Sequence, residues 1–260
     1  MPKSSRGGRR SAPTTRLPVR PAQATPQQAQ NIIQQLQNGD TIELSDFLTL
    51  SEDDKADAIS TIMTQGIPNF LDDSPFQKIL YYTEVDGKPH KAADSVLDNM
   101  AGPDLFRTVN SYYDRNTDVN YTAKEIYNQV CDGDYTMVSG RGGSAYGKGI
   151  YFADSFSSSK AYGNSTSKSK TLVMRAKFNN NAKSVSYSTV TRGVRNEISS
   201  GSKLGKVLRR MDSSNAESTY ALCKGYNVIR TGGYGGYYVV LDRSALTMST
   251  TTKAAVGSNW

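Results

Sequence analysis

The chain has 260 residues, of which 37% are hydrophobic and 21% charged, which fits one folded domain with a less ordered extension and excludes a wholly disordered protein. No run approaches the ~18 apolar residues of a membrane span, and no apolar segment follows the basic N-terminus, so we expect neither a membrane protein nor a secretory signal. Two cysteines and one histidine cannot supply a Cys/His zinc site or a disulfide framework. We therefore expect no metal, two buried thiols, and a location in a cytoplasm or in a particle assembled there.

The net charge of +7 is concentrated in an N-terminal arm. Six basic residues precede the first acidic residue, Asp40, and the remainder holds 25 basic and 24 acidic residues. A segment rich in Pro, Ser and Gly cannot bury enough surface to offset its chain entropy. We expect a disordered basic and Gln-rich arm over residues 1–39, with a short weak helix over 27–37. Residues 1–25 could contact nucleic acid non-specifically, or could simply aid solubility or packaging.

Residues 40–100 predict a helical lead-in. Ser51 and Asp54 have the spacing of a capping box, and an apolar stripe at Ile59, Ile62 and Met63 follows. A second helix is expected to begin at Ser74, with Pro75 in its first turn.

Residues 101–250 predict a compact, partly antiparallel α+β domain, followed by a flexible C-terminus at 251–260. Thr122 and Glu125 are spaced as a capping box for a helix that ends near Gly133. The polar stretch 185–215 predicts a loop with at most one helix near 204–211. Short strands are expected at 105–109, 135–139, 149–153, 171–178, 226–230 and 237–241.

A glycine-rich loop, residues 139–149, leads into a short strand that carries Tyr151 and Phe152. Small residues let the backbone approach a ligand closely, and a following aromatic ring offers a flat face to a planar heterocycle. The loop lacks the Lys-Ser/Thr ending of a phosphate loop and does not open a helix as a dinucleotide fingerprint does. The residues alone do not distinguish a ligand-binding loop from an ordinary hairpin loop.

The sequence Gly-Lys-Gly-Ile-Tyr-Phe-Ala-Asp at 147–154, followed by Ser-Lys-Ala-Tyr at 159–162, resembles the second signature of the ADP-ribosyltransferases related to diphtheria toxin and poly(ADP-ribose) polymerases. The strand at 104–109 and the helix at 122–133 fit the order of elements in that family. Residues 221–229 and 237–246 resemble its closing strands, in the form found in bacteriophage-encoded members. The resemblance covers about 104–247 and implies a split β-sandwich core with NAD as substrate.

The resemblance implies roles for individual residues. Arg107 would be the first-motif residue that grips NAD, and Tyr151 would stack on nicotinamide with Tyr162 as a second wall. A rival alignment places Arg141 in the first motif but leaves no room for the intervening helix, and Arg107 could also be a strand arginine with a solvated head group. Ser155 would have a supporting role. Further NAD contacts are expected at Thr108, Ser139, Gly140, Gly149 and Phe152.

The third motif departs from the family pattern. Transferring members carry a glutamate at the start of the penultimate strand, where it stabilises positive charge as nicotinamide leaves. Here that position reads Gly-Gly-Tyr-Tyr at 235–238, and no acidic residue lies between 230 and 241. The nearest candidates are Glu197, Glu217 and Asp242, any of which could be an ordinary surface carboxylate. The catalytic acid is therefore unassigned, with Glu217 carried forward as the candidate.

We expect an NAD-dependent mono-ADP-ribosyltransferase that modifies a macromolecular acceptor, with protein as the first choice. The missing third-motif glutamate and the basic arm also fit an inactive relative with a binding or virion-structural role. A nucleic-acid-binding module, which would rest on the arm alone, is a third reading. The expected location is a cytoplasm, that of the host if a phage encodes the protein, or the virion.

Overall fold

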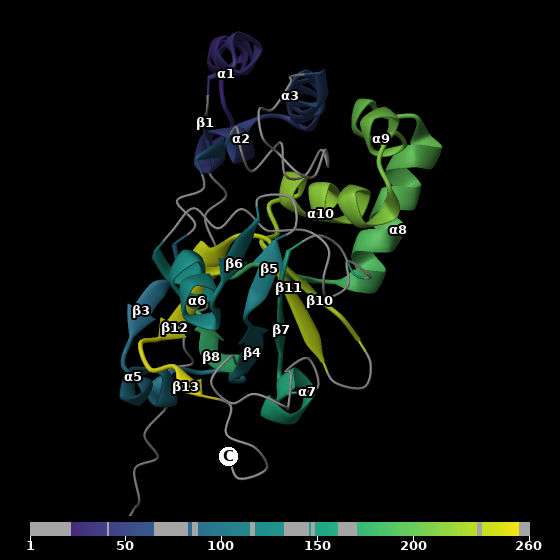
Figure 1. The fold of residues 1–260 in the computed structure, drawn as a ribbon. Helices are drawn as coiled ribbons and strands as arrows, with labels where there is room; N and C mark the ends of the chain where they lie inside the picture. Colours follow the sequence, from purple (N-terminus) through teal and green to yellow (C-terminus); the bar gives the residue numbers. More distant parts are fainter. Residues whose placement is uncertain are drawn as a thin grey trace, which may run out of the picture.

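The computed structural model describes residues 22–40, 42–64, 83–84, 88–114, 118–132, 146, 149–160, 171–232 and 236–254 (Figure 1). These residues form a mixed α/β structure around one large mixed sheet, which agrees with the expected α+β class. The expected helix beginning at Ser74 and the expected strand at 135–139 lie outside the described residues.

The large sheet has nine strands. Its strands follow the order β3 (His90–Ala92), β12 (Leu246–Ser249), β8 (Thr171–Phe178), β4 (Leu105–Asn110), β7 (Ile150–Ala153), β11 (Tyr237–Val240), β10 (Val228–Arg230) and β9 (Ser184–Ser186), with β13 (Lys253–Ala254) also paired to β8. All pairs are antiparallel except β3 with β12 and β9 with β10. Residues 253–254, which we expected to be part of a flexible C-terminus, therefore extend the sheet.

The sheet is nearly interrupted between β4 and β7. β4 pairs with β8 over all six of its residues, from Leu105 to Asn110. It pairs with β7 only where Phe106 faces Ala153. β7 in turn pairs with β11 along its whole length. Two well-paired groups of strands therefore meet at a single residue pair.

The N-terminal helices begin at local caps, of which the sequence predicts the one at Ser51. Thr25 and Gln28 form a capping box at the start of α1 (Pro26–Asn38), which ends at Gly39 in the left-handed conformation. The Ser51 hydroxyl accepts a hydrogen bond from the Asp54 amide at the start of α3 (Glu52–Thr64), as expected. Between them lie β1 (Ile42–Glu43), which pairs with β2 (Thr83–Glu84), and α2 (Leu44–Thr49).

Residues 26–38 therefore do not belong to a disordered arm. Ala29, Ile32 and Leu36 lie on one face of α1 and are buried, because α1 packs on α3 and supplies apolar side chains to a core. The boundary that we expected at residue 100 also differs from the packing. β3 belongs to the large sheet because it pairs with β12, and the helix that follows it, α5 (Asp94–Asn99), packs on β12.

The expectation of a loop over 185–215 is wrong, although the one helix expected near 204–211 agrees with a helix at Lys203–Leu208. This part of the chain forms α8 (Tyr187–Ser200), α9 (Lys203–Leu208) and the start of α10 (Ser213–Cys223). Ser186, Ser202 and Asp212 cap the three helices, and Gly201 ends α8 in the left-handed conformation. Val190 and Val194 lie four residues apart on the buried face of α8, a short apolar stripe that the many Ser and Thr residues conceal in the sequence.

Two apolar cores cover opposite faces of the sheet. Val239 and Val240 are neighbours on β11, and their side chains point to opposite faces because side chains alternate along a strand. Val239 joins the first core, in which α1, α2 and α3 pack with α8, α9 and α10. Val240 joins the second, which contains α6 (Ala123–Asp132). Thr122 and Glu125 form the expected capping box at the start of α6.

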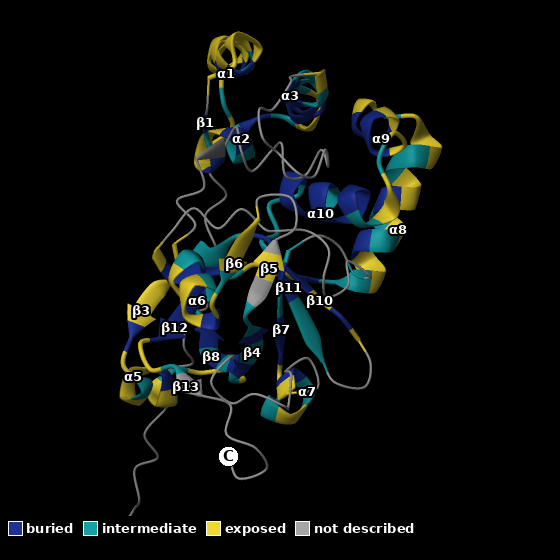
Figure 2. Ribbon diagram, in the orientation of Figure 1, coloured by how far each residue is buried: buried dark blue, intermediate teal, exposed yellow. Residues whose placement is uncertain are grey.

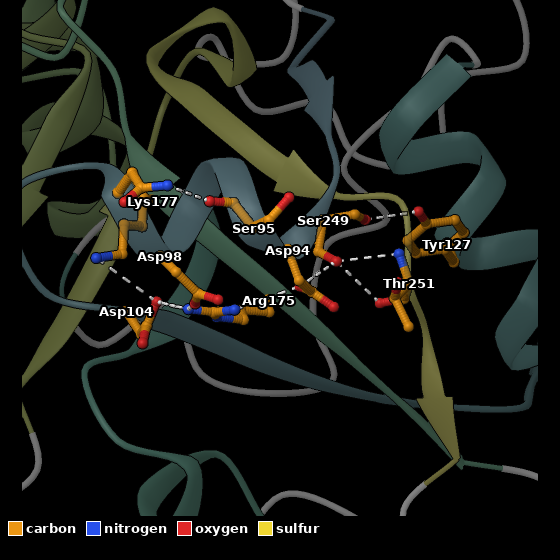
Figure 3. A network of polar contacts seen from close by, with 10 residues as sticks. Asp94, Ser95, Asp98, Asp104, Tyr127, Arg175, Lys177, Ser249 and Thr251 are labelled. Atoms are coloured by element: carbon orange, nitrogen blue, oxygen red, sulfur yellow. Dashed lines mark hydrogen bonds and ion pairs between the residues drawn. The ribbon is translucent and has the colours of Figure 1, made fainter.

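A polar network fastens α5 and the segment after it to β8 (Figure 3). The Arg175 guanidinium lies 3.3 Å from Asp94, 2.6 Å from Asp98 and 2.9 Å from Asp104. Lys177 donates to the carbonyl oxygens of Met100 and Gly102 at 2.9 and 3.0 Å. Because both cations lie on one strand and all their partners lie in 94–104, we interpret the network as structural.

Three short elements complete the described structure: the hairpin of β5 (Tyr112–Asp114) and β6 (Val119–Tyr121), α7 (Phe156–Lys160), and a 3-10 turn at Arg243–Ala245. Within the described ranges, no helix is both long and apolar enough to span a bilayer.

Candidate functional site

Arg107 crosses the interruption in the sheet. Its side chain lies on β4, and Nη1 donates a 3.0 Å hydrogen bond to the backbone carbonyl of Tyr151 on β7. Its Nε is buried and has no hydrogen-bond partner among the described residues. A buried donor without a partner costs roughly 1–3 kcal/mol, and such a cost is typical of functional sites. The Nε of Arg107 is therefore shielded from solvent, although the residue as a whole is half-buried.

Tyr151 is half-buried and packs against the first core. Its hydroxyl oxygen accepts a 3.1 Å hydrogen bond from the backbone amide of Tyr146. Burial raises the pKa of Tyr151 to about 12, and the nearby charge of Glu217 adds to this effect. The phenol is therefore neutral at physiological pH and can act through its ring and its hydrogen bonds.

Glu217 lies close to Tyr151 although it comes from a different element. It is on α10, is only 7% exposed, and accepts a 2.9 Å hydrogen bond from the hydroxyl of Tyr187 at the start of α8. The rings of Tyr187 and Tyr146 meet edge to face with centroids 5.0 Å apart. Contacts thus run from Arg107, through the Tyr151 backbone and the three tyrosine side chains, to Glu217, and they connect the three candidate catalytic residues.

Burial raises the pKa of Glu217, and the Tyr187 hydrogen bond and the positive charge of Arg195 partly offset that rise. Burial also raises the pKa of Tyr187 to about 12, and the hydrogen bond to Glu217 contributes to the rise. Tyr187 therefore keeps its proton and acts as a fixed donor to the carboxylate.

α10 buries an unusual number of polar side chains around Glu217. Asp212 caps the helix by accepting a hydrogen bond from the Asn215 amide at 3.0 Å. Asn215 Oδ1 and Thr219 Oγ1 are buried, yet neither has a hydrogen-bond partner in the described structure. Polar atoms left without partners destabilise a fold, so these two atoms favour a functional interpretation of α10. They do not flank the Glu217 carboxylate, because residues two apart point to different sides of a helix.

Glu197 and Asp242, the other candidate acids, have structural contacts. Glu197 forms an ion pair with Lys224 at 3.0 Å and accepts a hydrogen bond from Ser202. Asp242 accepts hydrogen bonds from the amide and hydroxyl of Ser244 at the start of the 3-10 turn. Neither has a described contact with Arg107 or Tyr151, which leaves Glu217 as the acid of this site.

Several positions expected to contact NAD make contacts within the protein instead. Phe152 is 1% exposed and packs in the second core, so its ring offers no stacking face; this corrects our expectation. The hydroxyls of Thr108 and Ser159 are 2.9 Å apart, and Ser155 caps α7 by accepting a hydrogen bond from Ser158. A Cβ atom at Gly149 would lie 2.5 Å from a side-chain methyl of Val239. The close packing of β11 against residue 149 therefore explains the glycine at this position without a ligand.

Ser139, Gly140, Tyr162 and the rival Arg141 lie outside the described residues. Tyr146 and Tyr187 were missed as site residues. The spacing of Ser186 and Thr189 as a helix cap was the local signal that could have placed Tyr187 at the start of a helix.

Both cysteines are buried, as expected, and burial raises the pKa of the Cys223 thiol to about 12. Among the residues that the structure describes, no three His, Cys, Asp or Glu side chains are grouped as metal ligands.

Comparison with known proteins adds no relative, because the chain matches no protein-family model, no curated protein and no solved structure. Its function is therefore inferred from the residues of the site.

Proposed function

We propose that the protein is an NAD-dependent mono-ADP-ribosyltransferase with a split β-sandwich core, acting on a macromolecular acceptor. The observation that carries the proposal is the convergence of Arg107, Tyr151 and Glu217 through described contacts. These three residues lie on three different elements, β4, β7 and α10. The near-interruption between β4 and β7 supports the split core.

The residues present suit NAD. The buried Nε–H of Arg107 needs an acceptor, which a phosphate or ribose oxygen of NAD would supply. Tyr151 offers a neutral ring for stacking on nicotinamide, and the Arg107 guanidinium bonds to the backbone carbonyl of the same residue. In the proposed reaction, the bond between the nicotinamide nitrogen and the ribose carbon breaks, nicotinamide leaves with the bonding electrons, and an acceptor nucleophile bonds to that carbon.

Glu217 would stabilise the positive charge that develops on the ribose as this bond breaks. The hydroxyl of Tyr187 holds one carboxylate oxygen at 2.9 Å and so fixes the orientation of the acid. A carboxylate fixed before the reaction needs no reorganisation during it, which is the physical basis of electrostatic catalysis. In this proposal, an acid on α10 replaces the one missing from β11.

A second candidate is an inactive relative that binds NAD or serves as a virion component. The absence of any acid between residues 230 and 241 and the deep burial of Glu217 favour it. In either case we propose a location in the cytoplasm of a cell, or in the virion if a phage encodes the protein. The acceptor is proposed to be a protein.

The two candidates are separated by incubating the full-length protein with NAD labelled on its adenylyl phosphate and a bacterial lysate. The proposal expects label on macromolecules together with release of nicotinamide, and loss of both in Arg107→Lys. Arg230→Lys, an exposed strand arginine on β10, is the matched control and should retain activity. Binding of NAD without cleavage or transfer would support the inactive relative. No binding of NAD by the folded protein would overturn the transferase proposal and leave only the virion role of the second candidate.

A further inference from the structure

The charge of the chain beyond the N-terminal arm is unevenly distributed. Residues 187–211 contain six basic residues and one acidic residue, Glu197. The rest of the chain after residue 20 contains 19 basic and 23 acidic residues. The near neutrality of the region after the arm is therefore an average over a basic segment and a mildly acidic remainder.

The basic segment consists of α8 and α9, which pack on each other at the edge of the molecule (Figure 1). A Cβ atom at Gly205 would lie 2.0 Å from the carbonyl oxygen of Glu197, so glycine allows the two helix backbones to come very close. Arg209 on α9 donates a 2.9 Å hydrogen bond to the carbonyl oxygen of Ile198 on α8. Figure 2 shows exposed stretches on both helices. All six cations of the segment are exposed residues.

We define the basic face by five exposed cations: Arg192 and Arg195 on α8, and Lys206, Arg209 and Arg210 at α9. None of them forms an ion pair with a described carboxylate. The nearby acids have other partners, since Glu197 pairs with Lys224, Asp57 pairs with Lys203, and Asp212 caps α10. The five cations thus have no carboxylate within ion-pair distance in the described structure, although the charge of Arg195 acts on Glu217.

The other exposed residues of α8 are small and polar: Ser188, Thr189, Asn196, Ser199 and Ser200. The large hydrophobic side chains that are exposed in the described structure, Val96, Tyr113 and Val119, lie on other elements. Protein interfaces usually require buried aromatic or aliphatic anchors, which this face lacks. Arg and Lys among Ser, Thr and Asn are the side chains that bind phosphate groups of nucleic acids.

We propose that the basic face binds the phosphate backbone of double-stranded nucleic acid, without sequence specificity. A duplex is favoured over a single strand because binding of single strands relies on aromatic stacking, and this face has no exposed aromatic ring. The duplex has the higher charge density. This inference goes beyond the proposed function and does not depend on it.

The basic face lies beside the candidate site. Arg195 is close enough to Tyr187 and Glu217 to lower the pKa of both groups. Nucleic acid bound along α8 would therefore lie next to Glu217, the proposed catalytic acid, and Tyr187, which holds it.

The test compares full-length proteins that differ by three charges. The face variant carries Arg192→Gln, Lys206→Gln and Arg210→Gln. It keeps Arg195, which lies beside the candidate site, and Arg209, which donates a hydrogen bond to the Ile198 carbonyl on α8. The control variant carries Lys88→Gln, Lys124→Gln and Lys160→Gln, three exposed cations on other elements. Both variants have the same net charge and keep the N-terminal arm, so a difference between them reports the position of the charges.

Binding to a labelled 20-base-pair duplex is measured by fluorescence anisotropy over a series of salt concentrations. We expect about 10- to 100-fold weaker binding by the face variant and a log–log salt slope shallower by about 2 to 3, because three phosphate contacts are lost. The control variant should bind within about twofold of the wild type. Each single substitution should reduce the slope by about 1, which provides a second readout if the triple variant is unstable.

Equal weakening of the face and control variants would overturn the proposal, because net charge or the arm would then account for binding. Unchanged binding by a folded face variant would also overturn it. A polyglutamate of matched charge should compete poorly. If it competes as well as the duplex, the face recognises acidic protein segments instead.

Discussion

Arg107 and Tyr151 are joined by a 3.0 Å hydrogen bond between Nη1 of the arginine and the backbone carbonyl of the tyrosine, at the place where β4 and β7 stop pairing. The arginine therefore closes a gap in the sheet with one nitrogen, while its buried Nε has no described partner. A single side chain thus combines a structural contact with a donor suited to a ligand.

Arg107→Lys should weaken NAD binding by about tenfold or more, because an ammonium group cannot make the two directed contacts of a guanidinium. Stability should fall by about 1–3 kcal/mol if the Tyr151 carbonyl loses its donor. Calorimetric titration with NAD and urea unfolding measure the two effects, with Arg230→Lys as the control. Wild-type NAD affinity in Arg107→Lys and also in Arg107→Ala would reject the assignment and favour Arg141.

Tyr151→Ala should weaken NAD binding by about 1–3 kcal/mol, because a stacking face is removed. Tyr151→Phe retains the ring and should bind NAD nearly as well as the wild type. It should still lose about 1 kcal/mol of stability, since the Tyr146 amide loses its acceptor. Equal damage to NAD binding in the two variants would show that the hydroxyl, rather than the ring, is the functional part.

Glu217→Gln should lower the rate of ADP-ribose transfer by about 100-fold or more while leaving NAD affinity within a few-fold, because the carboxylate acts on charge that develops in the transition state. The amide oxygen of glutamine can still accept the hydrogen bond from Tyr187, so the fold should be retained. Single-turnover transfer and NAD titration separate the two quantities. A variant that transfers at the wild-type rate would exclude Glu217 as the catalytic acid.

The same variant tests the burial of the carboxylate. Burial raises the pKa of Glu217 in the folded state above the 4.5 of an exposed glutamate, so the folded state binds more protons between the two values. The free energy of unfolding of the wild type should therefore fall as pH rises through that interval. The free energy of unfolding of Glu217→Gln should not fall in this interval, so the stability of the variant relative to the wild type should increase as pH rises. Parallel pH profiles of the melting temperature would contradict this.

Removal of residues 1–21 should leave stability and transfer activity unchanged. Removal of residues 1–25 should cost about 1 kcal/mol or more, because Thr25 caps α1 and the Ala24 amide donates to the Thr49 carbonyl. Thermal unfolding of the two truncated proteins measures the difference. Lost transfer to a nucleic-acid-free acceptor after removal of residues 1–21 would show that the arm belongs to the active site or the acceptor dock.

Lys55→Met should destabilise the protein by about 1–3 kcal/mol. The Lys55 ammonium is buried and donates a 2.9 Å hydrogen bond to the Cys223 carbonyl, which links α3 to α10. Lys203→Met removes an ion pair between two half-exposed groups, Lys203 and Asp57, and should cost less than about 1 kcal/mol. Urea unfolding of both variants compares them; equal costs would show that the buried contact has no special weight.

The sequence by itself determined the elements whose signals are local. The capping boxes at Ser51 and Thr122 predicted two helices correctly, because a cap is a hydrogen bond between residues three apart. Alternating side chains predicted β8 over 171–178, since a strand has a period of two. Arg107, Tyr151 and Glu217 were also selected from sequence, by resemblance for the first two and by elimination for the third.

Only the tertiary structure decided how these residues meet. The Tyr187–Glu217 hydrogen bond joins α8 to α10, in a region where abundant Ser and Thr concealed the helices. The single β4–β7 pair is likewise visible only in the structure. The basic residues of 187–211 can be counted in the sequence, but only the structure shows that they lie on two helices that pack together. Contacts between residues distant in sequence depend on how elements pack, and packing is set by the shapes of the two cores rather than by any local pattern.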